Sequence, residues 1–198
     1  MKKRAVFLDR DGTLNEDVGY PSVFSQIHIF PAAFEAVRKF RSAGFLTVVV
    51  TNQSAVGRGL MTEDGLKNIH KNISASFAAE GAELDAFYYC PHYERAALPI
   101  YRKNCDCRKP GPGLAVRAAA DLDLDLSASY MIGDKTEDIE FALNTGATPV
   151  LVLTGCGRES QLQLEEKGLR PAFVAEDILA AANWILRRER KIEETDAG

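Results

Sequence analysis

The sequence predicts an α/β fold built on a parallel sheet, and three observations support this. Apolar runs of strand length recur along the 198 residues, and stretches with helical periodicity separate them. The runs are nearly continuous rather than alternating, which is typical of parallel strands with both faces covered. With 46% hydrophobic residues, the chain is long enough for one substantial core. We therefore expect residues 1–187 to form one domain with a doubly wound, Rossmann-like sheet.

The elements follow in order along the chain. Strands are expected at Ala5–Leu8, Leu46–Val50, Ala86–Tyr89, Tyr130–Ile132, Pro149–Leu153 and Ala172–Ala175. Helices are expected at Ala32–Ser42, Glu63–Ala79, Gly113–Asp121, Glu137–Thr145, Glu159–Glu166 and Ile178–Arg187. Pro31 precedes the first helix, Gly44 follows it, and Thr62 is suited to cap the second. Residues 188–198 are charged and poor in apolar side chains, so we expect a flexible tail.

Composition narrows the class of protein. A formal net charge of -4 argues against a nucleic-acid partner. No apolar stretch is long enough to span a bilayer, and the apolar run after the basic start is too short for a signal peptide. We expect a cytoplasmic protein that acts as a monomer on a small molecule and binds neither nucleic acid nor membrane.

The most informative segment is the end of the first strand. Asp9 and Asp11 follow the apolar run and are separated by one residue, so in an extended chain both project to the same side. Adjacent carboxylates repel each other unless a cation or a shared proton relieves them. Gly12 then allows a sharp turn. A solvated Asp-Gly turn is the alternative, but the pattern favours a reactive carboxylate.

Polar residues follow other strands at the same predicted edge of the sheet. The second strand ends in Thr51, Asn52, Gln53 and Ser54, whose hydroxyl, amide and backbone N–H groups suit a phosphate or oxyanion. An ordinary polar turn is the alternative. Arg108 and Lys109 precede a helix and offer a planar fork and a compact charge to anions, unless they are merely solvated.

A third acidic segment follows the strand at Tyr130–Ile132. Asp134 comes directly after a glycine, next to Lys135, and carboxylate oxygens of this kind suit Mg²⁺. The alternative for Asp134 is a helix cap. For Asp138, four positions on, a cap is the favoured interpretation.

The segment 90–110 has no clear period, but its cysteines and histidine are spaced like the ligands of a metal ion that would hold the loop in place. Cys90, His92, Cys105 and Cys107 form two close pairs, which would give a closed tetrahedral Zn²⁺ site. Such a set leaves no position for water, so the zinc would be structural. Three free cysteines and an unrelated histidine are the alternative. The loop leads into Arg108 and Lys109, so zinc would position both residues.

These motifs together resemble the haloacid dehalogenase-like superfamily of phosphotransferases. The resemblance implies that Asp9 is a nucleophile forming an aspartyl-phosphate and that Asp11 is the general acid and base. It also implies Mg²⁺ held by Asp9, the backbone carbonyl of Asp11, and Asp134. Thr51, Asn52 and Lys109 would bind the phosphoryl oxygens. The stretch after Leu14 is too short for a large cap domain.

The zinc loop is similar to that of two families, the heptose bisphosphate phosphatases and the histidinol-phosphate phosphatases. The resemblance implies that Asp17, Val18, Gly19 and Tyr20 contact the substrate, together with Lys135. It also implies that Arg108 recognises a distal phosphate. A bisphosphate gives Arg108 an anionic partner, whereas histidinol phosphate brings a cationic amine, so the sugar is favoured. The expected role is in surface-glycan precursor synthesis. A non-catalytic zinc module that binds phospho-ligands is a more distant alternative.

Overall fold

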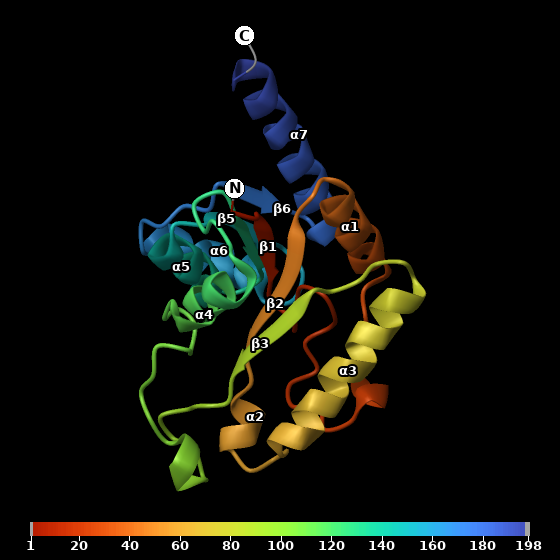
Figure 1. The fold of residues 1–198 in the computed structure, drawn as a ribbon. Helices are drawn as coiled ribbons and strands as arrows, with labels where there is room; N and C mark the ends of the chain where they lie inside the picture. Colours follow the sequence, from red (N-terminus) through yellow and green to blue (C-terminus); the bar gives the residue numbers. More distant parts are fainter. Residues whose placement is uncertain (1, 197–198) are drawn as a thin grey trace.

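Six parallel strands form one sheet at the centre of the computed structural model, which describes residues 2–196 (Figure 1). The strands are β1 (Ala5–Leu8), β2 (Leu46–Asn52), β3 (Ala86–Cys90), β4 (Tyr130–Gly133), β5 (Thr148–Val152) and β6 (Phe173–Ala175). Their order across the sheet is β3-β2-β1-β4-β5-β6, and all five neighbouring pairs are parallel. The predicted fold class is therefore confirmed.

Each of the six expected helices is present. The helices are α1 (Pro31–Ser42), α2 (Ser54–Gly57), α3 (Glu63–Ala79), α4 (Gly113–Leu122), α5 (Thr136–Thr145), α6 (Gly157–Glu166) and α7 (Ile178–Asp196), with 3-10 turns η1 (Phe24–Gln26) and η2 (Pro99–Tyr101). The Thr62 hydroxyl accepts a hydrogen bond from the backbone N–H of Gly65, so it caps α3 as predicted. The short α2 and the two 3-10 turns were not predicted, because they are too short to show a period.

Alternation along β1 divides the core into two layers. Val6 and Leu8 pack in a cluster with buried residues of α1, α3 and α7. Ala5 and Phe7 point to the other face, where buried residues of α4 and α5 cover them. Both faces of the strand are thus apolar, which explains why its sequence is a continuous hydrophobic run.

The order of the strands reverses beside β1, and this reversal places the site. From β1 the chain runs outward through β2 to β3 and then returns to β4 on the other side of β1. Leu8 is in register with Ile132, and the backbone N–H of Asp9 donates to the Ile132 carbonyl at 2.9 Å. Ligands of doubly wound sheets bind at such a switch point, beyond the carboxyl ends of the strands.

Helix α7 extends beyond the predicted end at Arg187. It continues to Asp196 and projects away from the sheet in Figure 1. Arg, Lys and Glu are good helix formers, so the charged composition does not stop the helix. Glu189 also ties it to the sheet by accepting a hydrogen bond from the Tyr130 hydroxyl at 2.5 Å. The flexibility expected of residues 188–198 stays a prediction, and Ala197 and Gly198 lie outside the described residues.

Within residues 2–196, no helix is both long enough and apolar enough to cross a membrane.

Candidate active site

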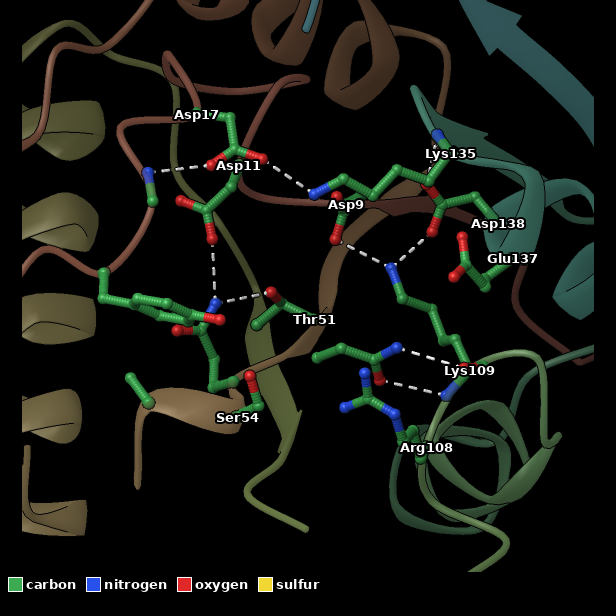
Figure 2. A pocket seen from close by; sticks show the side chains of 15 residues that line it. Asp9, Asp11, Asp17, Thr51, Ser54, Arg108, Lys109, Lys135, Glu137 and Asp138 are labelled. Atoms are coloured by element: carbon green, nitrogen blue, oxygen red, sulfur yellow. Dashed lines mark hydrogen bonds and ion pairs between the residues drawn. The ribbon is translucent and has the colours of Figure 1, made fainter. Parts of the chain in front are cut away.

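A cavity of about 320 Å³ opens at the carboxyl ends of the strands (Figure 2). It is lined by Asp9, Asp11, Asp17, Gly19, Tyr20, Thr51, Asn52, Gln53, Ser54, Ala55, Arg108, Lys109, Lys135, Glu137 and Asp138. The structure therefore brings most of the predicted site residues to one place, although they come from five separate segments of the chain. Asp134 is completely buried, and Val18 is exposed and does not line the cavity.

Lys109 joins two buried carboxylates. Its Nζ lies 2.7 Å from Asp9 Oδ1 and 2.5 Å from Asp138 Oδ1, and it also donates to the Val50 carbonyl (Figure 2). Burial alone would lower the pKa of Lys109, but Asp138 and Asp9 raise it overall, so the side chain is charged. Asp138 also accepts from the Lys135 N–H at 3.0 Å. It is both the cap favoured by the sequence and an ion-pair partner that the sequence did not indicate.

Three carboxylates crowd together behind this lysine. Ligand oxygens of Asp9, Asp134 and Asp138 all lie within 4.8 Å of one another. Burial, with Asp138 nearby, raises the pKa of Asp9 to about 6; burial and the charges of Asp9 and Asp138 raise that of Asp134 to about 8. Asp134 Oδ1 is buried and has no hydrogen-bond partner. An unpaired buried oxygen among hard carboxylates fits a divalent cation such as Mg²⁺.

Gly12 permits this crowding. Its φ of +87° is a left-handed conformation, and a Cβ there would lie only 2.2 Å from Asp134 Oδ2. Any larger residue would therefore push the Asp134 carboxylate away from Asp9.

Asp11 is held in a separate set of hydrogen bonds. Its carboxylate accepts from the Arg10 guanidinium at 3.0 and 2.7 Å, from Asn15 Nδ2 at 3.0 Å and from Gln53 Nε2 at 2.9 Å. Burial alone would raise the pKa of Asp11, but the charge of Arg10 and the hydrogen bonds from Arg10, Asn15 and Gln53 together lower it. Asp9 and Asp11 thus lie in different electrostatic environments, which raise the pKa of Asp9 and lower that of Asp11.

Two buried residues behind the site, Arg10 and His70, were not among the predicted site residues. Arg10 is fully buried, and its Nη1 lies 3.3 Å from His70 Nε2. His70 is also buried, and its ring stacks on Phe87 with centroids 4.8 Å apart. Burial lowers the pKa of His70 to about 3, so the ring is neutral. The arginine between the paired aspartates was the only signal for this contact.

The turn after β2 contacts both the Lys109 backbone and the side chains around Asp11. The Asn52 side chain accepts from the Lys109 N–H at 3.0 Å and donates to the Lys109 carbonyl at 3.1 Å. Thr51 Oγ1 accepts from Gln53 Nε2 at 2.8 Å, and Thr51 is buried beside Asp9 in the cavity. This turn fixes the backbone of Lys109 and thereby directs its charge at Asp9.

The segment 17–20 approaches the cavity from the other side. Asp17 Oδ2 lies 2.8 Å from Lys135 Nζ, which ties this segment to the end of β4 (Figure 2). The Arg58 guanidinium lies over the rings of Tyr20 and Tyr93, with centroid distances of 5.3 and 4.2 Å. Segment 17–20 and the loop at Tyr93 are therefore linked at the rim of the cavity.

The four predicted zinc ligands meet in one cluster. The three sulfur atoms of Cys90, Cys105 and Cys107 and the Nδ1 atom of His92 are separated by 3.1 to 3.6 Å in all six combinations. Four atoms at nearly equal separations form a tetrahedron, the geometry of structural zinc sites. Burial raises the pKa of the Cys90 and Cys107 thiols, and a bound cation would offset this by favouring thiolates. The donor set and its arrangement fit Zn²⁺.

Comparisons with known proteins agree with this geometry. A family model described as HAD-hydrolase-like matches residues 106–181. The D-glycero-beta-D-manno-heptose-1,7-bisphosphate 7-phosphatase of Escherichia coli (strain K12) is 43% identical over 153 residues, which are 76% of this chain and 80% of that protein. The D-glycero-D-manno-heptose-1,7-bisphosphate 7-phosphatase of Thermosynechococcus vestitus is 39% identical over 189 residues, which are 93% of this chain and 96% of that protein.

A solved structure is similar over nearly the whole chain. The D,D-heptose 1,7-bisphosphate phosphatase from B. bronchiseptica, complexed with magnesium and phosphate, superposes with a TM-score of 0.82 and 32% identity. The match covers 93% of this chain and 99% of that one.

The parallel sheet and the acidic groups after its two central strands define a haloacid dehalogenase-like hydrolase. Identity of 39–43% to relatives covered for most of their length narrows the assignment. The chain belongs to the D-glycero-D-manno-heptose 1,7-bisphosphate 7-phosphatase family.

Proposed function

We propose that this protein is a Mg²⁺-dependent phosphatase that removes the 7-phosphate of D-glycero-D-manno-heptose 1,7-bisphosphate and releases heptose 1-phosphate. One observation carries the proposal: the same cavity contains the buried Asp9 and, at its rim, Arg108. Arg108 Nη1 donates to the His92 carbonyl, and within residues 2–196 the guanidinium has no carboxylate partner. A cavity with a nucleophile inside and an available guanidinium at its rim suits a substrate with two phosphates.

The reaction proceeds in two steps. Asp9 attacks the phosphorus of the 7-phosphate, the bond from phosphorus to the sugar oxygen breaks, and the proton of Asp11 passes to that oxygen. Water then attacks the aspartyl-phosphate and gives its proton to Asp11, which frees phosphate and restores Asp9. The arriving phosphate brings negative charge beside Asp11 and so favours the protonated carboxyl that the first step needs.

The surrounding residues orient and neutralise the phosphoryl group. Lys109 and the groups of Thr51 and Asn52 would bind its oxygens as charge shifts during transfer. Mg²⁺, held by Asp9, the Asp11 carbonyl and Asp134, would supply positive charge that reduces repulsion between the nucleophile and the phosphate. The orphaned oxygen of Asp134 supports this assignment.

Recognition of the remainder of the sugar is assigned to the rim. We propose that Asp17, Gly19, Tyr20 and Lys135 contact the sugar and that Arg108 pairs with the 1-phosphate. Gln53 and Ser54 complete the wall beside Thr51. Val18 is exposed, 44% accessible, so its contact would require the segment to move on binding.

A substrate panel tests the choice of sugar. Initial rates should be compared for both anomers of heptose 1,7-bisphosphate and for histidinol phosphate, with Mg²⁺ present. We expect kcat/KM for one or both heptose anomers to exceed that for histidinol phosphate by about 10–100-fold, since a charge-assisted contact contributes about 1.5–3 kcal/mol. Arg108→Met should remove most of this preference. A preference for histidinol phosphate would overturn the proposal, and that alternative is not favoured by the relatives.

Zinc bound by Cys90, His92, Cys105 and Cys107 would act at a distance from the reaction. We propose that it fixes the loop that leads into Arg108 and Lys109. Stripping zinc while supplying Mg²⁺ should lower kcat/KM about 10–100-fold, as loss of supporting groups around a metal site does. It should also speed hydrogen exchange across residues 90–110. Exchange in α1 is the internal control, and zinc loss verified by metal analysis that changes neither exchange nor activity would contradict the role.

The remaining proposals concern organisation. Residues 1–187 are proposed to act as one phosphatase domain, and no described residue after 187 lines the cavity. We also propose that the protein is a monomer that acts in the cytoplasm on a small phosphorylated sugar. A reducing compartment of this kind would keep the cysteines reduced and able to bind metal.

A further inference from the structure

The buried contact between His70 and Arg10 has no part in the reaction described above, although it lies directly behind Asp11. Arg10 is 0% exposed and cannot reach a substrate. Its guanidinium donates to both oxygens of Asp11, to Gln53 Oε1 at 3.1 Å, and to His70 Nε2 at 3.3 Å. Four of its five N–H groups are thus engaged, and two of the four bind the Asp11 carboxylate.

This pairing of Arg10 with Asp11 requires support from elsewhere in the fold. The two residues are adjacent in sequence, and adjacent side chains in an extended chain point to opposite sides. The turn at Gly12 directs the Asp11 carboxylate toward the side of Arg10. The Arg10 side chain must then be held in the conformation that binds this carboxylate. His70 supplies that support from α3. Its ring is fixed between Phe87, stacked at 4.8 Å, and Tyr89, edge-on at 5.7 Å.

The direction of the hydrogen bond is settled by the chemistry of arginine. A guanidinium donates only, so Nε2 of His70 must accept and the ring must be neutral, with its proton on Nδ1. A donor at this position, such as a protonated imidazole, would repel Arg10. The contact therefore depends on an acceptor at the position of Nε2 and not on the bulk of the ring.

We propose that His70 and Arg10 are positioning residues for Asp11: His70 anchors the guanidinium, and its fork fixes the carboxyl group for proton transfer to the leaving oxygen. This inference rests on the proposed phosphatase function, because it assigns Asp11 the role of general acid. It extends the site to α3, a helix that contributes nothing to the lining of the cavity.

The dependence of the rate on the leaving group distinguishes a positioning role of His70 from a merely structural one. A sugar alkoxide needs a proton in order to depart, whereas 4-nitrophenolate departs readily without one. Because kcat/KM reports only steps up to the departure of the alcohol, a misplaced Asp11 should slow the sugar substrate selectively. The second step, water attack, affects kcat with both substrates.

The test compares His70→Phe with the native protein on heptose 1,7-bisphosphate and on 4-nitrophenyl phosphate. Phe keeps the stacked ring but removes the acceptor. We expect kcat/KM to fall about 30–100-fold for the sugar and less than about 3-fold for the aryl ester. General acids typically contribute about 10²–10⁴-fold, and a misplaced Asp11 should lose part of that contribution. His70→Gln restores an acceptor at the position of Nε2 and should recover most of the sugar rate.

Ile73→Val is the matched control, because Ile73 is buried on the same helix and its aliphatic side chain has no polar atom that could accept a hydrogen bond from Arg10. It should leave the ratio of the two rates unchanged. If His70→Phe does not fold, His70→Asn gives the same readout, since its side chain is too short to reach Arg10. Equal losses on both substrates, or no loss on either, would overturn the inference. The proposed function fails by a different result, namely a native protein that does not hydrolyse heptose 1,7-bisphosphate or that prefers histidinol phosphate.

Discussion

Asp9→Asn should abolish phosphate release, with kcat reduced on the order of 10⁴-fold or more, the scale seen when an enzyme loses its covalent nucleophile. The amide is uncharged and a poor nucleophile, so no aspartyl-phosphate can form. The variant should remain folded. The native Asp9 carboxylate is buried beside Asp134 and Asp138, and its raised pKa of about 6 shows that its charge is unfavourable there. Initial rates and a thermal melt measure the two outcomes.

Asp64→Asn is the control for this substitution. The Asp64 side chain is 94% exposed, at the start of α3, so the same chemical change there should leave the rate unaltered. If folded Asp9→Asn released phosphate at the native rate, the nucleophile would be another group.

Lys109→Met should be nearly as damaging to activity and more damaging to stability. It removes the cation that bridges Asp9 and Asp138, and breaking a buried ion pair by deleting one partner costs about 3–5 kcal/mol. Loss of the same charge from the phosphoryl group should reduce kcat by about 10²–10³-fold. Denaturant unfolding in EDTA measures the loss of stability, and initial rates measure the loss of activity.

Mg²⁺ separates the two effects of this substitution. A divalent ion should restore part of the lost stability, because it offsets repulsion between Asp9 and Asp134, but it should not restore kcat. Lys67→Met is the matched control, because Lys67 is exposed on α3 and its pair with the exposed Asp64, at 3.4 Å, is weak. Native stability in the Lys109→Met protein would show that this charge does not hold the buried carboxylates together.

The strand ends could be predicted because a parallel sheet brings all of its carboxyl edges together. Asp9 and Asp11 follow β1, Thr51 lies at the end of β2, and Asp134 follows β4, so apolar runs followed by polar residues were sufficient to group them. The zinc-ligand cluster could be predicted from the cysteine and histidine spacing alone. The two close pairs of ligands are joined by a loop long enough to bring them together, whatever path the loop takes.

Contacts between helices and these edges could not be predicted. His70 lies on the buried face of α3. The helical period predicts that this position is buried, but it does not distinguish a packing residue from one that accepts a hydrogen bond from Arg10. The exposure of Val18 depends on the path of a loop, which its sequence does not determine. The charged residues after Arg187 are compatible with helix or disorder, and the contact of Glu189 with Tyr130 favours the helix.

Trapping the covalent intermediate tests the central claim most directly. The native protein, mixed with Mg²⁺ and substrate and quenched in acid during turnover, should carry one phosphoryl group. Peptide mapping should place it on Asp9, and Asp9→Asn should carry none. A phosphoryl group on another side chain would contradict the account. So would transfer of the phosphate directly to water, shown by inversion at a chiral phosphorus where two displacements would give retention.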